Sequence, residues 1–234
     1  MPVAAQVRTW HRRLSYVIGL QLLLWTGSGL VFTWDPIEDV RGESSLRPEA
    51  PPPAPPLADI VSVDRAAQAA GLPAPGEARL AWRRGRWTWS LSAPRAAPGE
   101  AVLVDALTGT PLPTMNADEA ARLAAGLLAA DAPVTGVAHV ARAEGEYRDK
   151  PTPAWRVDFA DGRGTSLYVV AATGEVGAVR NDLWRRFDWL WMLHIMDYRD
   201  REDFGTPWLT AAALLGVTTA LSGLLLAGLS LRRA

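Results

Sequence analysis

The chain contains two long stretches without charged side chains, one near each end. No Asp, Glu, Lys or Arg occurs between Leu14 and Thr33, or between Thr206 and Leu231. A helix that crosses a hydrocarbon core of ~30 Å needs roughly 20 residues at ~1.5 Å per residue. The pattern therefore predicts two transmembrane helices, at residues 14–34 and 206–231.

The first stretch has a second interpretation, a cleaved signal peptide. Such a peptide has an apolar region of about 7–15 residues followed by a cleavage site with small residues. This run is longer and ends in Phe32-Thr33-Trp34-Asp35-Pro36, which lacks such a site. We therefore expect an uncleaved anchor.

Flanking charges predict the orientation of both helices. Arginines precede the first helix and follow the second (Arg8, Arg12, Arg13, Arg232 and Arg233), whereas acidic residues lie near the opposite ends. Cytoplasmic segments of membrane proteins carry an excess of Lys and Arg. Residues 1–13 and 232–234 are therefore predicted to be cytoplasmic, and the central region to lie in the periplasm beside a bacterial inner (plasma) membrane.

The region between the helices divides into a spacer, a repeated unit and a connector. Residues 35–56 form the spacer, whose Pro48–Pro56 tract is expected to be extended. Residues 57–113 and 114–180 each predict a helix followed by antiparallel strands, and the last strand enters a Thr-Gly turn in both. The expected fold is membrane-anchored α+β.

The helices are expected at residues 61–71 and 116–128, the second with a capping box at Asn116 and Glu119. The predicted strands are Ala78–Trp82, Arg86–Ser92 and Glu100–Asp105 in the first unit, and Val134–Arg142, Ala154–Phe159 and Thr165–Val170 in the second. Residues 181–205 are rich in aromatic side chains and predict an interfacial helix with a connector.

A helix, antiparallel strands and a final strand ending in Thr-Gly resemble the PepSY domain, here as two tandem units. The start of the first anchor, Trp10-His11-Arg12-Arg13, and the segment Leu193-His194-Ile195-Met196-Asp197-Tyr198 resemble the PepSY-associated transmembrane helix family. Larger members of that family, which include proteins similar to siderophore-iron reductases, have at least four membrane helices. This chain has two predicted helices.

Composition excludes several classes of function. The net charge is −1 and no basic patch stands out, so nucleic-acid binding is not expected. The chain has no cysteine, which excludes disulfides, thiol catalysis and thiolate metal sites. The common hydrolase, P-loop and dinucleotide motifs are absent, and no catalytic residue is predicted.

Three histidines remain as candidates for chemistry: His11, His139 and His194. Imidazole is a common axial ligand of haem iron, and the resembling reductases imply haem held between membrane helices. His11 and His194 belong to opposite membrane faces, so one haem cannot use both. We expect a homodimer in which paired His11 side chains bind one haem and paired His194 side chains bind another, with glycines 27, 29, 216 and 223 permitting close helix approach.

Each histidine also has a purely structural interpretation. His11 beside two arginines could extend to water, His194 could bond Asp197 or a lipid headgroup, and His139 could be a satisfied surface or strand histidine. The haem hypothesis implies a redox or iron/siderophore-uptake accessory. The alternative is a membrane-anchored interaction module that modulates a protease or joins a partner complex, with Trp82, Trp87 and Trp89 either on a recognition face or in the core.

Overall fold

The structure is a computed structural model that describes residues 3–97 and 99–231. It separates into a helical unit, built from the chain up to Pro36 and from Arg185 onward, and a folded unit, Ile37–Trp184. The cytoplasmic tail predicted at 232–234 lies outside the described residues. At this level the predicted class is found: two long apolar helices, and two small antiparallel sheets that each pack with a helix.

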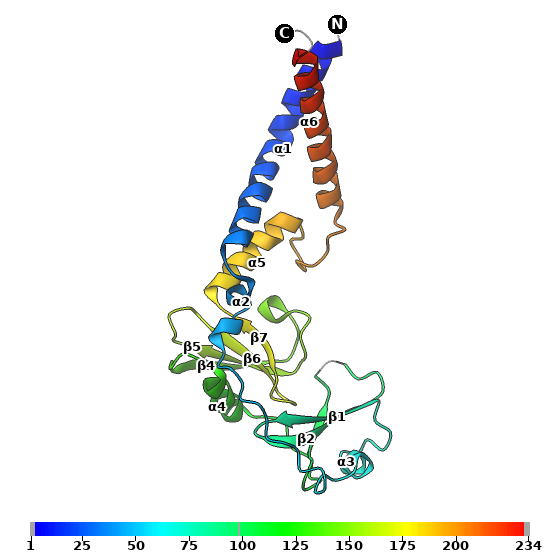
Figure 1. The fold of residues 1–234 in the computed structure, drawn as a ribbon, viewed down its shortest axis with the longest axis vertical. Coiled ribbons are helices and arrows are strands. Elements are labelled where there is room, and N and C mark those ends of the chain that lie inside the picture. Colours follow the sequence, from blue (N-terminus) through cyan, green and yellow to red (C-terminus); the bar gives the residue numbers. More distant parts are fainter. Residues whose placement is uncertain (1–2, 98, 232–234) are drawn as a thin grey trace. The chain divides into compact units, whose positions relative to one another are not determined.

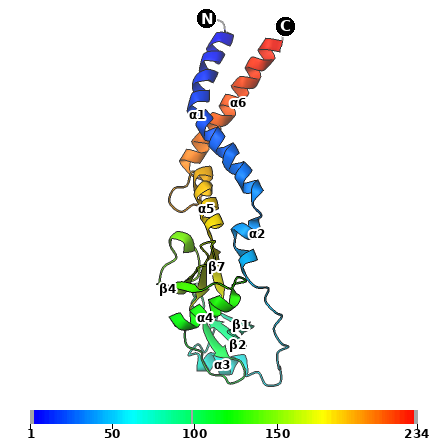
Figure 2. The same ribbon diagram turned by 90° about the vertical axis from the view of Figure 1, so that its left-hand side faces the viewer.

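The helical unit is dominated by α1 (Val3–Trp34) and α6 (Pro207–Leu231), each long and apolar enough to cross a membrane. The two helices run antiparallel and cross, so the start of α1 and the end of α6 lie at the same end of the helix pair (Figures 1 and 2). Ile18 is buried between them, and a Cβ added at Gly216 would lie 3.7 Å from Leu22. A helix with small residues at its contact face allows this close approach.

The shorter helix α5 (Asp182–Ile195) packs in the same unit against the C-terminal half of α1. The ring centroid of Phe32 lies 4.6 Å from that of Phe187 and 5.8 Å from that of Trp191. A salt bridge joins Arg186 to Asp35 at 2.6 Å. The sequence predicts this helix as an interfacial element, and the structure adds that aromatic contacts hold it on α1.

The first sheet has the order β1-β2-β3, with β1 at Glu77–Arg83, β2 at Arg86–Ser92 and β3 at Val102–Asp105. Both residues of the β1–β2 turn have positive φ, 53° at Arg84 and 76° at Gly85, as a two-residue hairpin turn that follows the strand twist requires. Helix α3 (Val63–Ala69) buries two alanines against this sheet.

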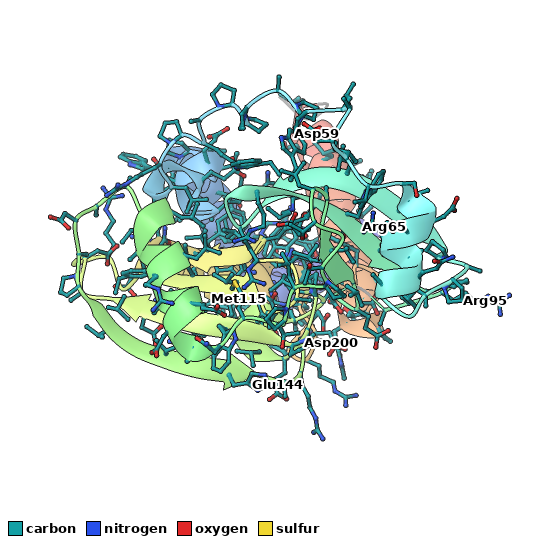
Figure 3. All side chains as sticks on the ribbon, turned by 90° about the horizontal axis from the view of Figure 1, so that it is seen from below. Asp59, Arg65, Arg95, Met115, Glu144 and Asp200 are labelled. Atoms are coloured by element: carbon teal, nitrogen blue, oxygen red, sulfur yellow. The ribbon has the colours of Figure 1, made fainter. Side chains whose placement is uncertain are left out.

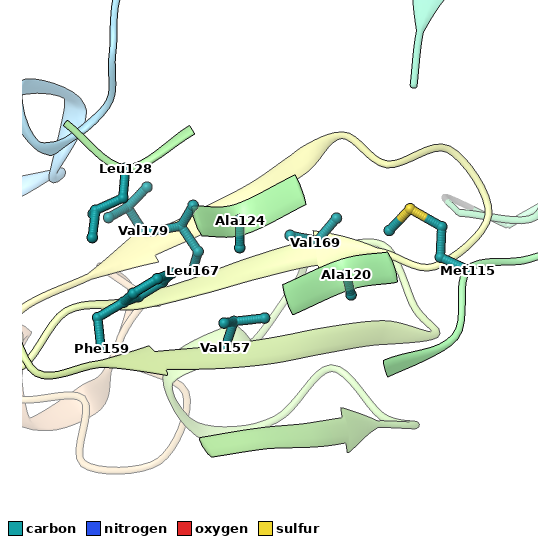
Figure 4. Packing of buried hydrophobic residues seen from close by; sticks show 9 residues of the cluster. All are labelled: Met115, Ala120, Ala124, Leu128, Val157, Phe159, Leu167, Val169 and Val179. Carbon is teal, nitrogen blue, oxygen red and sulfur yellow. The ribbon is translucent and has the colours of Figure 1, made fainter. Parts of the chain in front are cut away.

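The second sheet has the order β4-β5-β6-β7 and packs against α4 (Ala117–Leu127). Its strands are β4 (Val134–Val140), β5 (Ala154–Phe159), β6 (Ser166–Val170) and β7 (Val176–Arg180). Small helix residues, Ala120 and Ala124, allow α4 to lie close to the apolar strand face, where Leu167 and Val169 are fully buried (Figure 4). Met115 lies in the interior of the folded unit, whereas Arg95 and Glu144 lie at its rim (Figure 3).

The capping box predicted at the start of α4 is present. The Asn116 side chain accepts from the Glu119 backbone N–H at 2.9 Å, and the Glu119 carboxylate accepts from the Asn116 N–H at 3.0 Å. The predicted strands appear with boundaries within two residues.

The sequence does not predict the fourth strand of the second sheet. Beyond the Thr173-Gly174 turn the chain returns as β7, whereas beyond Thr108-Gly109 it returns only as an isolated bridge between Val104 and Pro111. Proline lacks the N–H that a strand ladder uses, and Pro113 follows two residues later, so both residues weaken pairing at this edge. The two units differ in strand number, and these prolines contribute to the difference.

The spacer predicted at residues 35–56 is only partly free of regular structure. Residues 37–47 pack on the folded unit through α2 (Ile37–Val40) and a short 3₁₀ helix, Glu43–Ser45. Val40 is 2% exposed, and the Arg47 N–H donates to the Leu127 carbonyl at 2.8 Å. These apolar and backbone contacts explain why the segment is ordered. The proline tract beyond it has no regular secondary structure.

Candidate functional site

His11 lies on the face of α1 that packs against α6. Its Nδ1 atom is 2.7 Å from Ser222 Oγ and 3.2 Å from the Thr219 carbonyl oxygen. A Cβ added at Gly223 would lie 3.1 Å from His11 Cε1, so the glycine makes room for the ring. The imidazole is thus held at a helix–helix contact.

The hydrogen bonds assign the tautomer of His11. The Ser222 hydroxyl has one proton, which it donates to the Thr219 carbonyl at 2.8 Å. The serine oxygen must therefore accept from His11, which places the imidazole proton on Nδ1. A neutral imidazole with this tautomer carries its lone pair on Nε2.

The structure places His11 deeper along the helix pair than the sequence suggests. Its partner Ser222 lies nine residues before the end of α6, a rise of about 13 Å. His11 is partly buried at this contact and has hydrogen-bond partners on α6. Its interpretation as an interfacial cation stays open, since the position of a membrane boundary is not defined.

His194 lies near the end of α5 and contacts the C-terminal half of α1. Its Nδ1 atom is 2.8 Å from Ser28 Oγ, and its backbone carbonyl accepts from Trp25 Nε1 at 2.7 Å. The Ser28 hydroxyl donates its one proton to the Leu24 carbonyl at 2.6 Å, so its oxygen must accept the hydrogen bond from His194. We again assign the ring proton to Nδ1 and the free lone pair to Nε2.

Aromatic rings surround His194. The Trp191 ring is nearly parallel to it, at 5° and 6.2 Å between centroids, and Phe32 meets it edge-on at 5.4 Å. Burial lowers the pKa of His194 below its usual value, because the charged imidazolium loses water. The ring is therefore neutral near pH 7, as a metal ligand must be.

The alternative bond between His194 and Asp197 is wrong. The Asp197 carboxylate is 7% exposed and accepts from four backbone N–H groups in the connector between α5 and α6, those of Arg199, Asp200, Glu202 and Asp203. The bonds from Asp203 and Glu202 are the main reason that its pKa lies well below the usual range. This side chain organises the connector.

The structure does not bring His11 and His194 together. His11 belongs to α1, and His194 is bonded to Ser28 of the same helix. Residues 11 and 28 are separated by about 25 Å along a helix. Their side chains cannot ligate the same iron within one chain. Each histidine has instead its own serine partner at its own level of the helix pair.

Nothing in the sequence alone singles out Ser28 and Ser222. The available signal was spacing, because Trp25, Ser28 and Phe32 recur at helical intervals on one face of α1. A hydroxyl within an apolar helix can also bond its own backbone, so spacing alone does not reveal a histidine partner. The contact needed the packing of α5 and α6 against α1.

The remaining aromatic and histidine candidates lie in the folded unit. His139 is exposed on β4, edge-on to Trp155 at 5.0 Å, as the structural interpretation predicts. Trp89 packs on the α3 core and donates from Nε1 to the Val61 carbonyl at 3.0 Å. Trp82 and Trp87 are a cross-strand pair near the hairpin turn.

Trp82 also borders a cleft of about 790 Å³ in the folded unit. Leu123 and Leu127 of α4 contribute apolar wall, and Arg47 and Lys150 contribute positive charge. The size suits a small molecule or a side chain of a partner protein.

Among residues 3–97 and 99–231, no three His, Cys, Asp or Glu side chains are grouped as ligands of a metal ion. Haem iron needs only one or two imidazoles from the protein, so this absence does not bear on haem, for which each histidine could supply one ligand. Comparisons with protein-family models, curated proteins and solved structures find no match to this chain.

Proposed function

We propose that this protein is a PepSY-type inner-membrane protein that binds haem through His11 and His194, and acts as a redox or iron/siderophore-uptake accessory. One observation carries the proposal. In both histidines Nδ1 is held by a serine oxygen, which leaves the Nε2 lone pair for a metal.

This arrangement has the chemistry of a metal-ligating imidazole. Such a histidine generally donates its other ring N–H to an oxygen acceptor, which fixes the tautomer and the direction of the lone pair. Ser222 and Ser28 supply that acceptor, and each serine is fixed in turn by a backbone carbonyl. When bound, haem would supply one-electron chemistry.

The residues around each histidine have separate tasks. Gly223 gives the His11 ring room beside α6, and Trp25 fixes the end of α5 so that His194 stays on α1. Phe32 and Trp191 exclude water from the outer ring and keep it neutral. Two sites at two levels of the membrane suit transfer of electrons across it.

The proposal assumes two copies of the chain, because each copy supplies one imidazole at each level. Paired His11 side chains would form an inner site and paired His194 side chains an outer site. The antiparallel helix pair is consistent with both termini on one side of the membrane (Figures 1 and 2). The flanking arginines assign that side to the cytoplasm.

The test is the absorbance spectrum of the full chain, purified from cells supplied with haem. We expect a Soret band, about half of it lost in His11→Ala and about half in His194→Ala, with none left in the double variant. His139→Ala is the matched control and should keep the full band, since that residue lies on an exposed strand. A colourless wild type, or a double variant with the full band, would refute the proposal.

A second candidate function is the periplasmic interaction module. The cleft beside Trp82 supports it, because an aromatic side chain next to charged groups of both signs suits a partner protein. The experiment is co-purification with the wild type and with Trp82→Ala. A stoichiometric protease or transporter that is retained by the wild type, lost in the variant and accompanied by no pigment would favour this function over haem binding.

A further inference from the structure

The edges of the two sheets differ in how they are protected. A strand at an edge presents unpaired backbone N–H and C=O groups, and proteins commonly guard such edges with charge, proline or short length. Strand β1 carries Glu77, Arg79 and Arg83. Strand β3 has four residues and a proline bridge, and β7 has five residues and ends at Arg180.

Strand β4 lacks most of these protections. It is the outermost strand of the second sheet and has β5 as its one paired neighbour in the part of the chain described (Figure 4). Its seven residues, Val134–Val140, include no Asp, Glu, Lys, Arg or Pro. A register shift between Val134 and Gly136 disturbs only the start, so the ladder from Gly136 to Val140 is regular.

The side chains of β4 are also open to solvent. Val137 is 37% exposed, and Thr135, Ala138 and His139 are exposed as well. A regular, uncharged and exposed edge is the kind of strand to which another strand adds. Such an edge needs an occupant or it becomes a site of aggregation.

A second copy of this chain fits the edge better than a charged peptide does. An acidic or basic partner strand finds no opposite charge on β4, whereas the same neutral strand turned antiparallel places no like charges opposite each other. A twofold contact of this kind is self-complementary. Two copies anchored in one membrane also share an orientation and a raised local concentration.

We infer that β4 pairs antiparallel with β4 of a second copy, so that the two second sheets become continuous across a twofold axis. The inference names a surface for the dimer that the proposed function assumes. It does not depend on haem, and the two ideas fail independently.

The absence of native cysteine makes a disulfide scan clean. Single cysteines would be placed in turn at residues 134–140 of the full chain, and cross-linking would be followed in native membranes. Directly opposed residues have Cα atoms about 4.5–5.5 Å apart, within the range of a disulfide. A residue two positions from the axis meets its own copy about 13 Å away along the strand, which is too far.

We therefore expect a sharp cross-linking maximum at one or two adjacent positions of β4, and little at Arg79→Cys on the charged edge of β1. Ala138→Lys should abolish cross-linking from the best position, while circular dichroism shows that the fold is kept. Equal cross-linking at β1 and β4, none along β4, or adducts with a different protein would overturn the inference.

The Soret absorbance of the same membrane preparations distinguishes the β4 pairing inference from the haem proposal. Cross-links along β4 without a Soret band would uphold this inference and refute haem binding. A full Soret band without cross-links along β4 would overturn the inference and leave the haem proposal standing.

Discussion

The connector between α5 and α6 depends on one carboxylate, and Asp197→Asn tests that dependence. In the native chain each oxygen of Asp197 accepts from two backbone N–H groups. One takes the bonds from Arg199 and Asp200 at 3.1 and 3.3 Å, and the other those from Glu202 and Asp203 at 3.0 and 3.1 Å. Asparagine keeps one oxygen and replaces the other with an amide that is itself a donor.

At least two of the four hydrogen bonds are therefore lost. Hydrogen bonds to a charged acceptor contribute roughly 1.5–3 kcal/mol each, so the loss is about 3 kcal/mol at the lower figure. Local opening of the connector should become about 100-fold more frequent, since each 1.4 kcal/mol is tenfold. Hydrogen exchange at the amides of residues 199–203 measures this opening directly.

The effect has a defined pH dependence. Because the folded-state pKa of Asp197 lies below its usual 3.8, its contribution is fully present above about pH 4. The contribution is lost as the pH falls through the folded-state pKa, and the difference between native chain and variant shrinks there. Asp200→Asn, at an exposed position of the same connector, should leave exchange unchanged. If Asp197→Asn exchanged like the native chain at pH 7, the account of this carboxylate would be wrong.

Four further predictions follow from contacts in both units. Ser28→Ala and Ser222→Ala should each keep the helices but weaken haem binding about 10- to 100-fold, measured by haem titration, because the imidazole loses its orienting acceptor. Gly223→Ala should shift the spectrum of the inner site, since the new Cβ lies 3.1 Å from His11, whereas Gly228→Ala meets no atom within 4 Å and should not. Leu167→Ala should destabilise the folded unit by about 2–5 kcal/mol in thermal or denaturant unfolding, against little change for the exposed Leu57→Ala. Gln21→Leu should leave stability in detergent unchanged or raise it by about 1–3 kcal/mol, because the buried Gln21 Nε2 has no hydrogen-bond partner in the described chain; a clear loss of stability would show that this amide has a partner elsewhere.

Much of the folded unit was predictable because its signals are local. The Asn116–Glu119 capping box, the alternating strands and the Thr-Gly turns each depend on residues a few positions apart. The position of α4 against its sheet follows from small residues on one helix face. The fourth strand was missed because Val176-Gly177-Ala178 carries a weak strand pattern, and its partner in the ladder decides its state.

The candidate site was predictable only in part, for a different physical reason. A histidine in or beside an apolar helix is conspicuous, so His11 and His194 stand out in sequence. Their serine partners are 211 and 166 residues away along the chain and look like ordinary small residues of membrane helices. Only the packing of three helices shows which serine meets which ring.

The two serine contacts also bear on the choice between a structural and a functional histidine. A nitrogen that is buried without a partner costs free energy, whereas an accessible ring nitrogen can be left to solvent or to a ligand. In both histidines the described hydrogen bonds converge on Nδ1. Neither Nε2 atom is among the buried polar atoms without a partner in the described residues, so the geometry is compatible with a ligand at Nε2 and with a structural histidine. The spectrum of the purified chain decides between these two roles, because only bound haem gives a Soret band.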